Sequence, residues 1–188
     1  MSRWRWALLI LVTIGVGVAY LGSMIRTSRS MPPIHDVATD LNDLPQFSRL
    51  PPRADNLARV PDGGRAELTA LSPEERWKAL HRAAYGDLKP LRLAAAPAAV
   101  LQAAEDLVRE RGWKIAEGQG ASDTLEATAT TPVFRFKDNV VVRVRADPQR
   151  PGGSVVDMRS TSRIGVSDLG TNAKRVRRLL ADLKERIA

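Results

Sequence analysis

The spacing of apolar residues changes along the chain, and each change marks a new kind of segment. Residues 6–25 hold no charge over 20 positions, which is the length that a helix needs to cross a bilayer core of roughly 30 Å. We therefore predict a single-pass transmembrane helix within an N-terminal membrane anchor, residues 1–29. Arg3 and Arg5 precede it, so the positive-inside rule places the following domain on the periplasmic, extracytoplasmic side of the inner membrane. The alternative for the same segment is a cleaved signal peptide.

The next stretch, residues 30–71, is rich in proline. It contains six of the 12 prolines of the chain, and prolines at this density interrupt both helices and strands. The composition predicts a proline-rich linker or a segment that wraps the domain. His35 and Asp36 stand together in it, but His81 is the only other histidine and cysteine is absent. The sequence therefore predicts no metal site, no disulfide and no cofactor.

Periodic patterns return in residues 72–188. Ser72 and Pro73 begin a helix with a capping pattern, and apolar residues at three- and four-residue spacing follow Pro97 and, near the end of the chain, Leu169. Between the last two helices apolar residues alternate with polar ones, as in strands with one buried face. The elements from residue 89 onward follow the order β-α-β-β-β-β-α. They predict a two-layer α+β domain with helices on one face of a mostly antiparallel sheet.

Two details of the strand region are specific predictions. The change of apolar parity after Pro132 predicts a strand that continues through Phe134 and Phe136 with a bulge or an edge position at the proline. Residues 137–139 are then the tight turn of a hairpin. The alternation in the strands that follow places arginines, among them Arg143 and Arg159, on an outward, solvated face.

Basic and polar residues gather where these strands lead into the last helix. Basic side chains beside the free amides of a helix N-terminus suit an anion such as a phosphate, a carboxylate or a lipid head group. The sequence predicts a candidate anion- or partner-binding set that consists of Arg135, Lys137, Arg143, Arg159, Arg163, Asp168 and Asn172. The competing interpretation is structural: Asp168 caps the helix, Asn172 bonds a neighbouring loop, and the arginines pair with Glu126 and Asp157.

Three motifs follow one another in the second half of the chain: F-x-F-K-D at 134–138, R-S-x-S-R-x-G at 159–165 and S-D-x-G-x-N-x-x-R at 167–175. This ordered run resembles the bacterial and plastid family DUF1499, a domain of unknown function. The resemblance covers about residues 31–186. It implies an envelope-associated or membrane-anchored protein, and no established activity comes with it.

The function that these patterns favour is a membrane-anchored envelope protein whose domain binds a partner or an anionic ligand without catalysis. No histidine lies near Ser160 or Ser162 in sequence, and no glycine-rich phosphate loop occurs. The alternatives are a small hydrolase that uses Asp138, Arg159 and Asp168, and a lipid or small-molecule carrier with a cavity between helix and sheet. The net charge of +8 suits an anionic lipid or an acidic envelope protein partner. Nucleic acid is not expected, because aromatic residues are not interleaved with the charges.

Overall fold

The computed structural model describes residues 3–118 and 122–188, with part of the side chains of the N-terminal helix left out. Residues 1–2 of the predicted anchor and residues 119–121 lie outside the described residues. The elements in chain order are α1 (Arg3–Ser30), β1 (Asp36–Ala38), the short 3-10 helix η1 (Ala66–Leu68), α2 (Pro73–Tyr85), β2 (Leu91–Leu93), α3 (Pro97–Glu110), β3 (Lys114–Ile115), β4 (Thr124–Thr130), β5 (Lys137–Ala146), β6 (Ser154–Ser162) and α4 (Thr171–Ile187).

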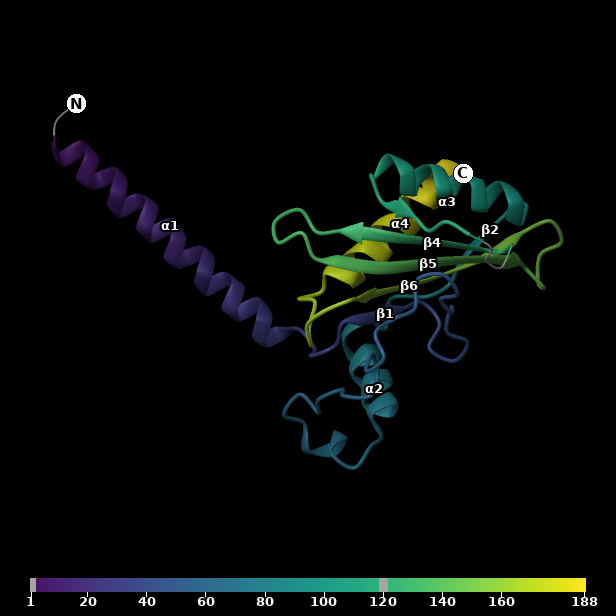
Figure 1. The fold of residues 1–188 in the computed structure, drawn as a ribbon, viewed down its shortest axis with the longest axis horizontal. Coiled ribbons are helices and arrows are strands. Elements are labelled where there is room, and N and C mark those ends of the chain that lie inside the picture. Colours follow the sequence, from purple (N-terminus) through teal and green to yellow (C-terminus); the bar gives the residue numbers. More distant parts are fainter. Residues whose placement is uncertain (1–2, 119–121) are drawn as a thin grey trace.

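The strands form one sheet with the order β1-β6-β5-β4-β3, and β2 also pairs with β6. All pairings described are antiparallel, so the predicted mixture of helices with a mostly antiparallel sheet is confirmed. The helices α3 and α4 pack against each other and against one face of this sheet (Figure 1). Their buried residues Leu107, Val108, Val176 and Leu179 meet the valines of β5 in one hydrophobic core. We call the opposite face of the sheet the outer face.

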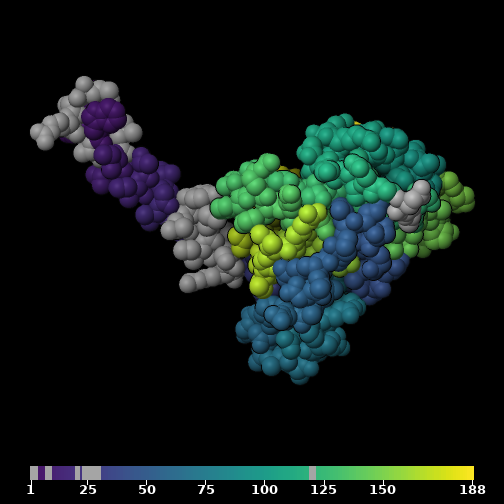
Figure 2. Space-filling model, viewed as in Figure 1, coloured from purple at the N-terminus to yellow at the C-terminus, as the bar shows by residue number. Residues whose placement is uncertain are grey.

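The proline-rich segment lies on the outer face and is not a free spacer. After β1, residues 39–53 cross β6, β5 and β4, and Figure 2 shows this part of the chain, in blue, over the face that is turned to the viewer. Its flanks contribute Ile34 and Val60 to the hydrophobic core. These contacts hold the proline-rich segment around the domain, and we call it the wrapping segment.

Helix α2 follows the wrapping segment and begins as the sequence predicts. The Ser72 hydroxyl accepts a hydrogen bond from the Glu75 amide, and the Glu75 carboxylate accepts one from the Ser72 amide, which is the capping box. The indole N–H of Trp77 donates to the carbonyl of Asp36 at 2.8 Å, and this hydrogen bond connects α2 to β1.

The hairpin between β4 and β5 differs from the prediction. Residues 137–139 belong to β5, and the turn is the loop 131–136, which is closed by a hydrogen bond from the Thr131 amide to the Phe136 carbonyl at 2.8 Å. Arg135 reverses the chain there with a φ of 57°. The predicted bulged strand through Phe134 and Phe136 is therefore wrong, because both residues lie in the exposed loop.

Residues 3–30 form the helix α1, which extends away from the domain (Figure 1). In the described part of the chain, no helix combines the length and the apolar character that membrane crossing requires.

Candidate functional site

The sheet separates the predicted site residues onto two faces. Lys137, Arg143, Arg159 and Arg163 lie on the outer face, since successive side chains of a strand alternate between faces. Asp168 and Asn172 lie on the helix side, where Asn172 is completely buried. The predicted set is therefore not one site.

Arg159 is a structural residue, and its predicted position on a solvated face is wrong. It is only 5% exposed, because residues 39–53 cover it. Its Nε and Nη2 donate to the two carboxylate oxygens of Asp36 at 3.0 and 2.7 Å, and its guanidinium lies 5.5 Å from the ring centre of Phe47. A charge that is enclosed and paired in this way cannot reach a ligand.

Arg143 is also engaged by the wrapping segment. Its Nη2 contacts the Asp43 carboxylate at 3.1 Å and the Asp157 carboxylate at 3.2 Å, and Arg145 contacts both of these acids at 2.7 Å. The hydrogen bond from Arg143 lowers the pKa of Asp43 below its ordinary value. The predicted pairing of arginine with Asp157 is therefore present, with Asp43 as an additional partner.

Glu126 has a different partner from the predicted cross-strand arginine. Its buried carboxylate accepts hydrogen bonds from the amides of Ser48, Arg49 and Leu50 at 2.8, 3.0 and 2.8 Å, and from the Ser48 hydroxyl at 2.7 Å. Burial acts to raise the pKa of Glu126, but these hydrogen bonds outweigh it and the pKa is lowered. The carboxylate thus anchors the wrapping segment to β4.

A buried polar network occupies the helix side at the start of α4. Asn172 donates to the His35 carbonyl and the Ser162 hydroxyl, both at 2.9 Å, and accepts from the Ser160 hydroxyl at 2.7 Å. Arg175 binds the carboxylate of the buried Asp138 at 2.6 Å. The predicted loop contact of Asn172 is present in this network, which ties β5 and β6 to α4.

Asp168 contributes to the start of α4 from outside the helix. The helix begins at Thr171, and Asp168 accepts hydrogen bonds from the amides of Asn172 at 2.6 Å and Gly170 at 3.0 Å. Burial raises the pKa of Asp168 above its ordinary value, and the charge of Asp138 adds to the rise. Asp138 and Asp168 lie on the helix side and Arg159 on the outer face, so the residues of the hydrolase alternative do not share a cleft.

Lys137 and Arg163 line a pocket on the outer face, at the edge where β3 and β4 pair. The pocket has a volume of about 550 Å³. Two further cations, Arg49 and Lys114, line it together with Thr128, Thr130 and one acid, Glu117. We call it the basic pocket. Its cations come from the wrapping segment, from β3, from β5 and from the residue that follows β6.

The strand register brings the cations of the basic pocket together. Lys114 stands opposite Thr128, and Lys137 stands opposite Thr130, on the same face of neighbouring strands. Arg163 is fixed by two neutral acceptors, the Asn139 side-chain oxygen at 2.7 Å from Nε and the Thr128 hydroxyl at 2.9 Å from Nη2. The pocket thus presents a pre-oriented guanidinium together with two lysines.

Three of these cations are left without an ion-pair partner among the described residues. Within the part of the chain that the structure describes, Lys114, Lys137 and Arg163 form no ion pair, whereas Arg49 lies 3.6 Å from Glu126. A guanidinium offers a fork of N–H donors that matches a carboxylate or a phosphate, and lysines add point charge. The chemistry of the pocket is that of an anion-binding site.

Sequence reasoning found two of the four cations. Lys114 was missed, although its alternation with Ile115 in a short strand indicates an exposed position; the structure places it opposite Thr128. Arg49 was missed because nothing in the sequence shows where the wrapping segment crosses the sheet. Arg135, the remaining predicted residue, lies in the exposed loop 131–136, outside the lining of the basic pocket.

Comparison with known protein families identifies the family of this chain. The model of the family described as a protein of unknown function, DUF1499, matches residues 36–183. The chain belongs to the DUF1499 family. No curated protein matches it. The match begins at Asp36, within the wrapping segment.

Most of the residues in the three DUF1499 motifs that are discussed above form buried hydrogen bonds or ion pairs that stabilise the fold. Asp138, Ser160, Ser162, Asn172 and Arg175 form the buried network at the start of α4. In addition, Arg159 pairs with Asp36. Of the motif residues, Lys137 and Arg163 reach the basic pocket, and these two connect the family motifs to a surface that is open to a ligand.

Proposed function

We propose that this member of the DUF1499 family is a membrane-anchored envelope protein whose domain binds an anionic ligand in the basic pocket without catalysing a reaction. The observation that carries the proposal is the group of three unneutralised cations, Lys114, Lys137 and Arg163, around one pocket. The ligand class is a molecule or head group with a phosphate or a cluster of carboxylates.

The geometry supports binding because the folded chain already orders the Arg163 side chain, so less conformational entropy is lost when a ligand binds. Arg163 is held by Asn139 and Thr128, so its fork does not have to be ordered when an anion enters. The hydroxyls of Thr128 and Thr130 add neutral donors beside the charges. The site is open to water, so its affinity should fall with ionic strength, as screening predicts.

Binding is tested on the full chain in detergent by isothermal titration calorimetry with inorganic phosphate, pyrophosphate and citrate. We expect the double variant Lys114→Ala, Lys137→Ala to bind at least about ten-fold more weakly, which corresponds to the loss of roughly 1.4 kcal/mol. The matched control is Lys89→Ala, Lys184→Ala, which removes the same charge from exposed positions outside the pocket. Equal affinities for the two double variants, or no binding by the unaltered chain, would refute the proposal.

The membrane part of the proposal is supported by the sequence alone. Residues 6–25 carry no charge, and Arg3 and Arg5 precede them. The proposal places the chain in the inner membrane, with the domain on the extracytoplasmic side. Membrane fractionation and a reporter fused after Ala188 test this. Recovery of the chain in the soluble fraction, or a fused reporter that is active only in the cytoplasm, would contradict it.

A further inference from the structure

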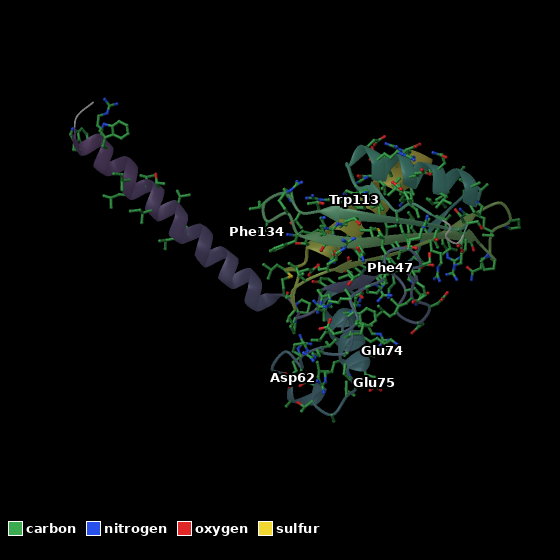
Figure 3. The ribbon with its side chains drawn as sticks, viewed as in Figure 1. Phe47, Asp62, Glu74, Glu75, Trp113 and Phe134 are labelled. Carbon is green, nitrogen blue, oxygen red and sulfur yellow. The ribbon has the colours of Figure 1, made fainter. Side chains whose placement is uncertain are left out.

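Two loops at one end of the sheet carry large apolar side chains in the open. In the loop 131–136, Val133 is 78% and Phe134 65% exposed, and the ring of Phe136 stacks on that of Phe134 at 5.5 Å. In the loop that follows β6, Ile164 is 57% exposed and Val166 is similar. Figure 3 places Phe134 at the end of the domain that is nearer to α1. Clustered apolar side chains in the open mark an interaction surface.

The two loops are neighbours in the fold. Asp138 at the start of β5 pairs with Ser162 at the end of β6, so both loops leave the sheet at the same end of these two strands. The Arg163 amide donates to the Lys137 carbonyl at 3.1 Å, which fixes the base of one loop against the base of the other. The exposed apolar residues of both loops therefore belong to one end of the domain.

The N-terminal helix enters the domain beside these loops. The Ser167 hydroxyl donates to the Pro32 carbonyl at 3.2 Å, and a ring nitrogen of His35 lies 3.3 Å from the Val166 carbonyl. Helix α1 ends at Ser30, next to this contact (Figure 1). Only residues 26–30 separate the uncharged segment from the domain, and at 1.5 Å per helical residue they span roughly 8 Å.

The charged residues next to these apolar residues in the sequence are mostly basic. Arg135 and Lys137 alternate with the two phenylalanines, and Arg163 precedes Ile164. The nearest acids in sequence do not oppose them, since Asp138 is buried against Arg175 and Asp168 is half-buried with its carboxylate on the amides before and within α4. Apolar tips between basic residues are the composition of segments that lie in the interface of an anionic membrane.

We propose that loops 131–136 and 163–167 form a bilayer-docking surface, whose apolar tips enter the interface of a membrane that contains anionic lipid. The proposal rests on the membrane anchoring given under Proposed function, because the anchor brings these loops to the bilayer. Docking holds the basic pocket beside the lipid surface, since Arg163 belongs to both and Lys137 directly follows the loop 131–136. It therefore deepens the binding proposal by naming the surface from which an anionic head group is presented.

The natural absence of cysteine makes the test direct. Single cysteines are introduced as Phe134→Cys or, as a control in the exposed turn at the other end of β5, Gln149→Cys, and each is labelled with an environment-sensitive fluorophore. The full chain is reconstituted into vesicles of neutral phosphatidylcholine, with or without anionic phosphatidylglycerol. We expect the label at residue 134 to be several-fold less accessible to acrylamide than the control in anionic vesicles, and to be quenched by spin-labelled lipid.

Charge and occupant are tested with the same label. Arg135→Glu should reduce the protection in anionic vesicles, whereas Arg150→Glu, beside the control position, should leave it unchanged. Equal acrylamide quenching at residues 134 and 149 in anionic vesicles would overturn the docking surface. So would protection of residue 134 that rises with protein concentration in detergent, since a second copy would then be the occupant.

Failure of docking is distinguishable from failure of the proposed function. If phosphate binding depends on Lys114 and Lys137 while the label at residue 134 stays exposed, the docking surface is wrong and the basic pocket stands. If alkaline carbonate extracts the chain from vesicles, the anchoring is wrong, and the docking that rests on it is overturned with it.

Discussion

The buried ion pair between Asp36 and Arg159 joins the wrapping segment to the centre of the sheet, and its removal gives a quantitative test of the fold. Asp36 has no exposed surface and receives guanidinium hydrogen bonds at 3.0, 3.3 and 2.7 Å. The Asn56 side chain also donates to it. The substitution Arg159→Ala leaves the carboxylate in place without its cation. Breaking a buried pair from one side costs about 3–5 kcal/mol, because the remaining charge is uncompensated.

The assay is urea unfolding of the full chain in mild detergent, followed by tryptophan fluorescence. Trp77 is fully buried and donates to the carbonyl of Asp36, so its emission reports on the region that the substitution disturbs. The matched control is Arg177→Ala, which removes an equally well-formed pair with Asp87, at 2.7 Å, from an exposed position. Exposed pairs contribute at most about 1 kcal/mol, so the control should change the free energy of unfolding little.

A double-mutant cycle completes the test. Asp36→Ala combined with Arg159→Ala should cost less than the sum of the single substitutions by about 2 kcal/mol, since the double variant leaves no unpaired charge. Equal effects of Arg159→Ala and Arg177→Ala would refute the assignment of Arg159 as a buried structural residue. The predicted solvated position of Arg159 would then be correct after all.

Two further predictions concern the pH dependence of stability. Burial lowers the pKa of His81 from 6.5 to about 4, so the unfolded chain binds a proton at His81 at a higher pH than the folded chain does. The free energy of unfolding should therefore fall by roughly 3 kcal/mol from pH 6.5 to pH 4. In urea titrations, His81→Gln should remove that part of the fall. The lowered pKa of Glu126 contributes stability that is present above its ordinary value of 4.5 and lost as pH falls below it. Glu126→Gln should therefore cost about 2 kcal/mol at neutral pH, where the carboxylate accepts charge-assisted hydrogen bonds, and progressively less in acid; a cost that does not change with pH would contradict this.

Local signals in the sequence were sufficient for most helices and strands. The capping box at Ser72 and Glu75 fixes the start of α2, and Gly112, with a φ of 65°, ends α3 by a hydrogen bond from the Trp113 amide to the Val108 carbonyl at 3.1 Å. Both signals act within one or two helical turns. They can be read without knowledge of the tertiary structure.

The position of the β4–β5 turn depends on residues far along the chain. Asp138 and Asn139 have the polarity of turn residues, but Asp138 is bound by Arg175 of α4, and the Asn139 side chain donates to the carbonyls of Leu50 and Pro51 at 2.9 and 3.2 Å. These long-range partners draw the two residues into β5. The apolar alternation of Phe134 and Phe136 predicted burial that the exposed loop does not give them.

The outer face of the sheet is polar although the wrapping segment covers part of it, and the sequence therefore predicts a solvated face. A covering segment rich in proline, with only β1 paired in the sheet, leaves backbone groups that need partners once they are buried. The sheet supplies them with polar side chains: Glu126 accepts from the amides of residues 48–50, and Arg143 donates to the Asp43 carbonyl at 2.8 Å. A strand whose polar face lies under such a segment shows the same alternation of polar and apolar residues as a strand whose polar face lies in water. The sequence alone therefore cannot distinguish a covered polar face from a solvated one.

The polar residues of the outer face fall into two groups: those that bind the wrapping segment and those that line the basic pocket. Where the wrapping segment crosses β6, β5 and β4, the cations and acids of the sheet are occupied by it. The crossing reaches the edge of the basic pocket at Arg49 and Leu50, which line it. Beyond that edge, Lys114, Lys137 and Arg163 line the pocket and form no ion pair within the described chain, so their charge is available to an anion that enters from outside. The candidate site is the part of the polar face that the chain leaves uncovered.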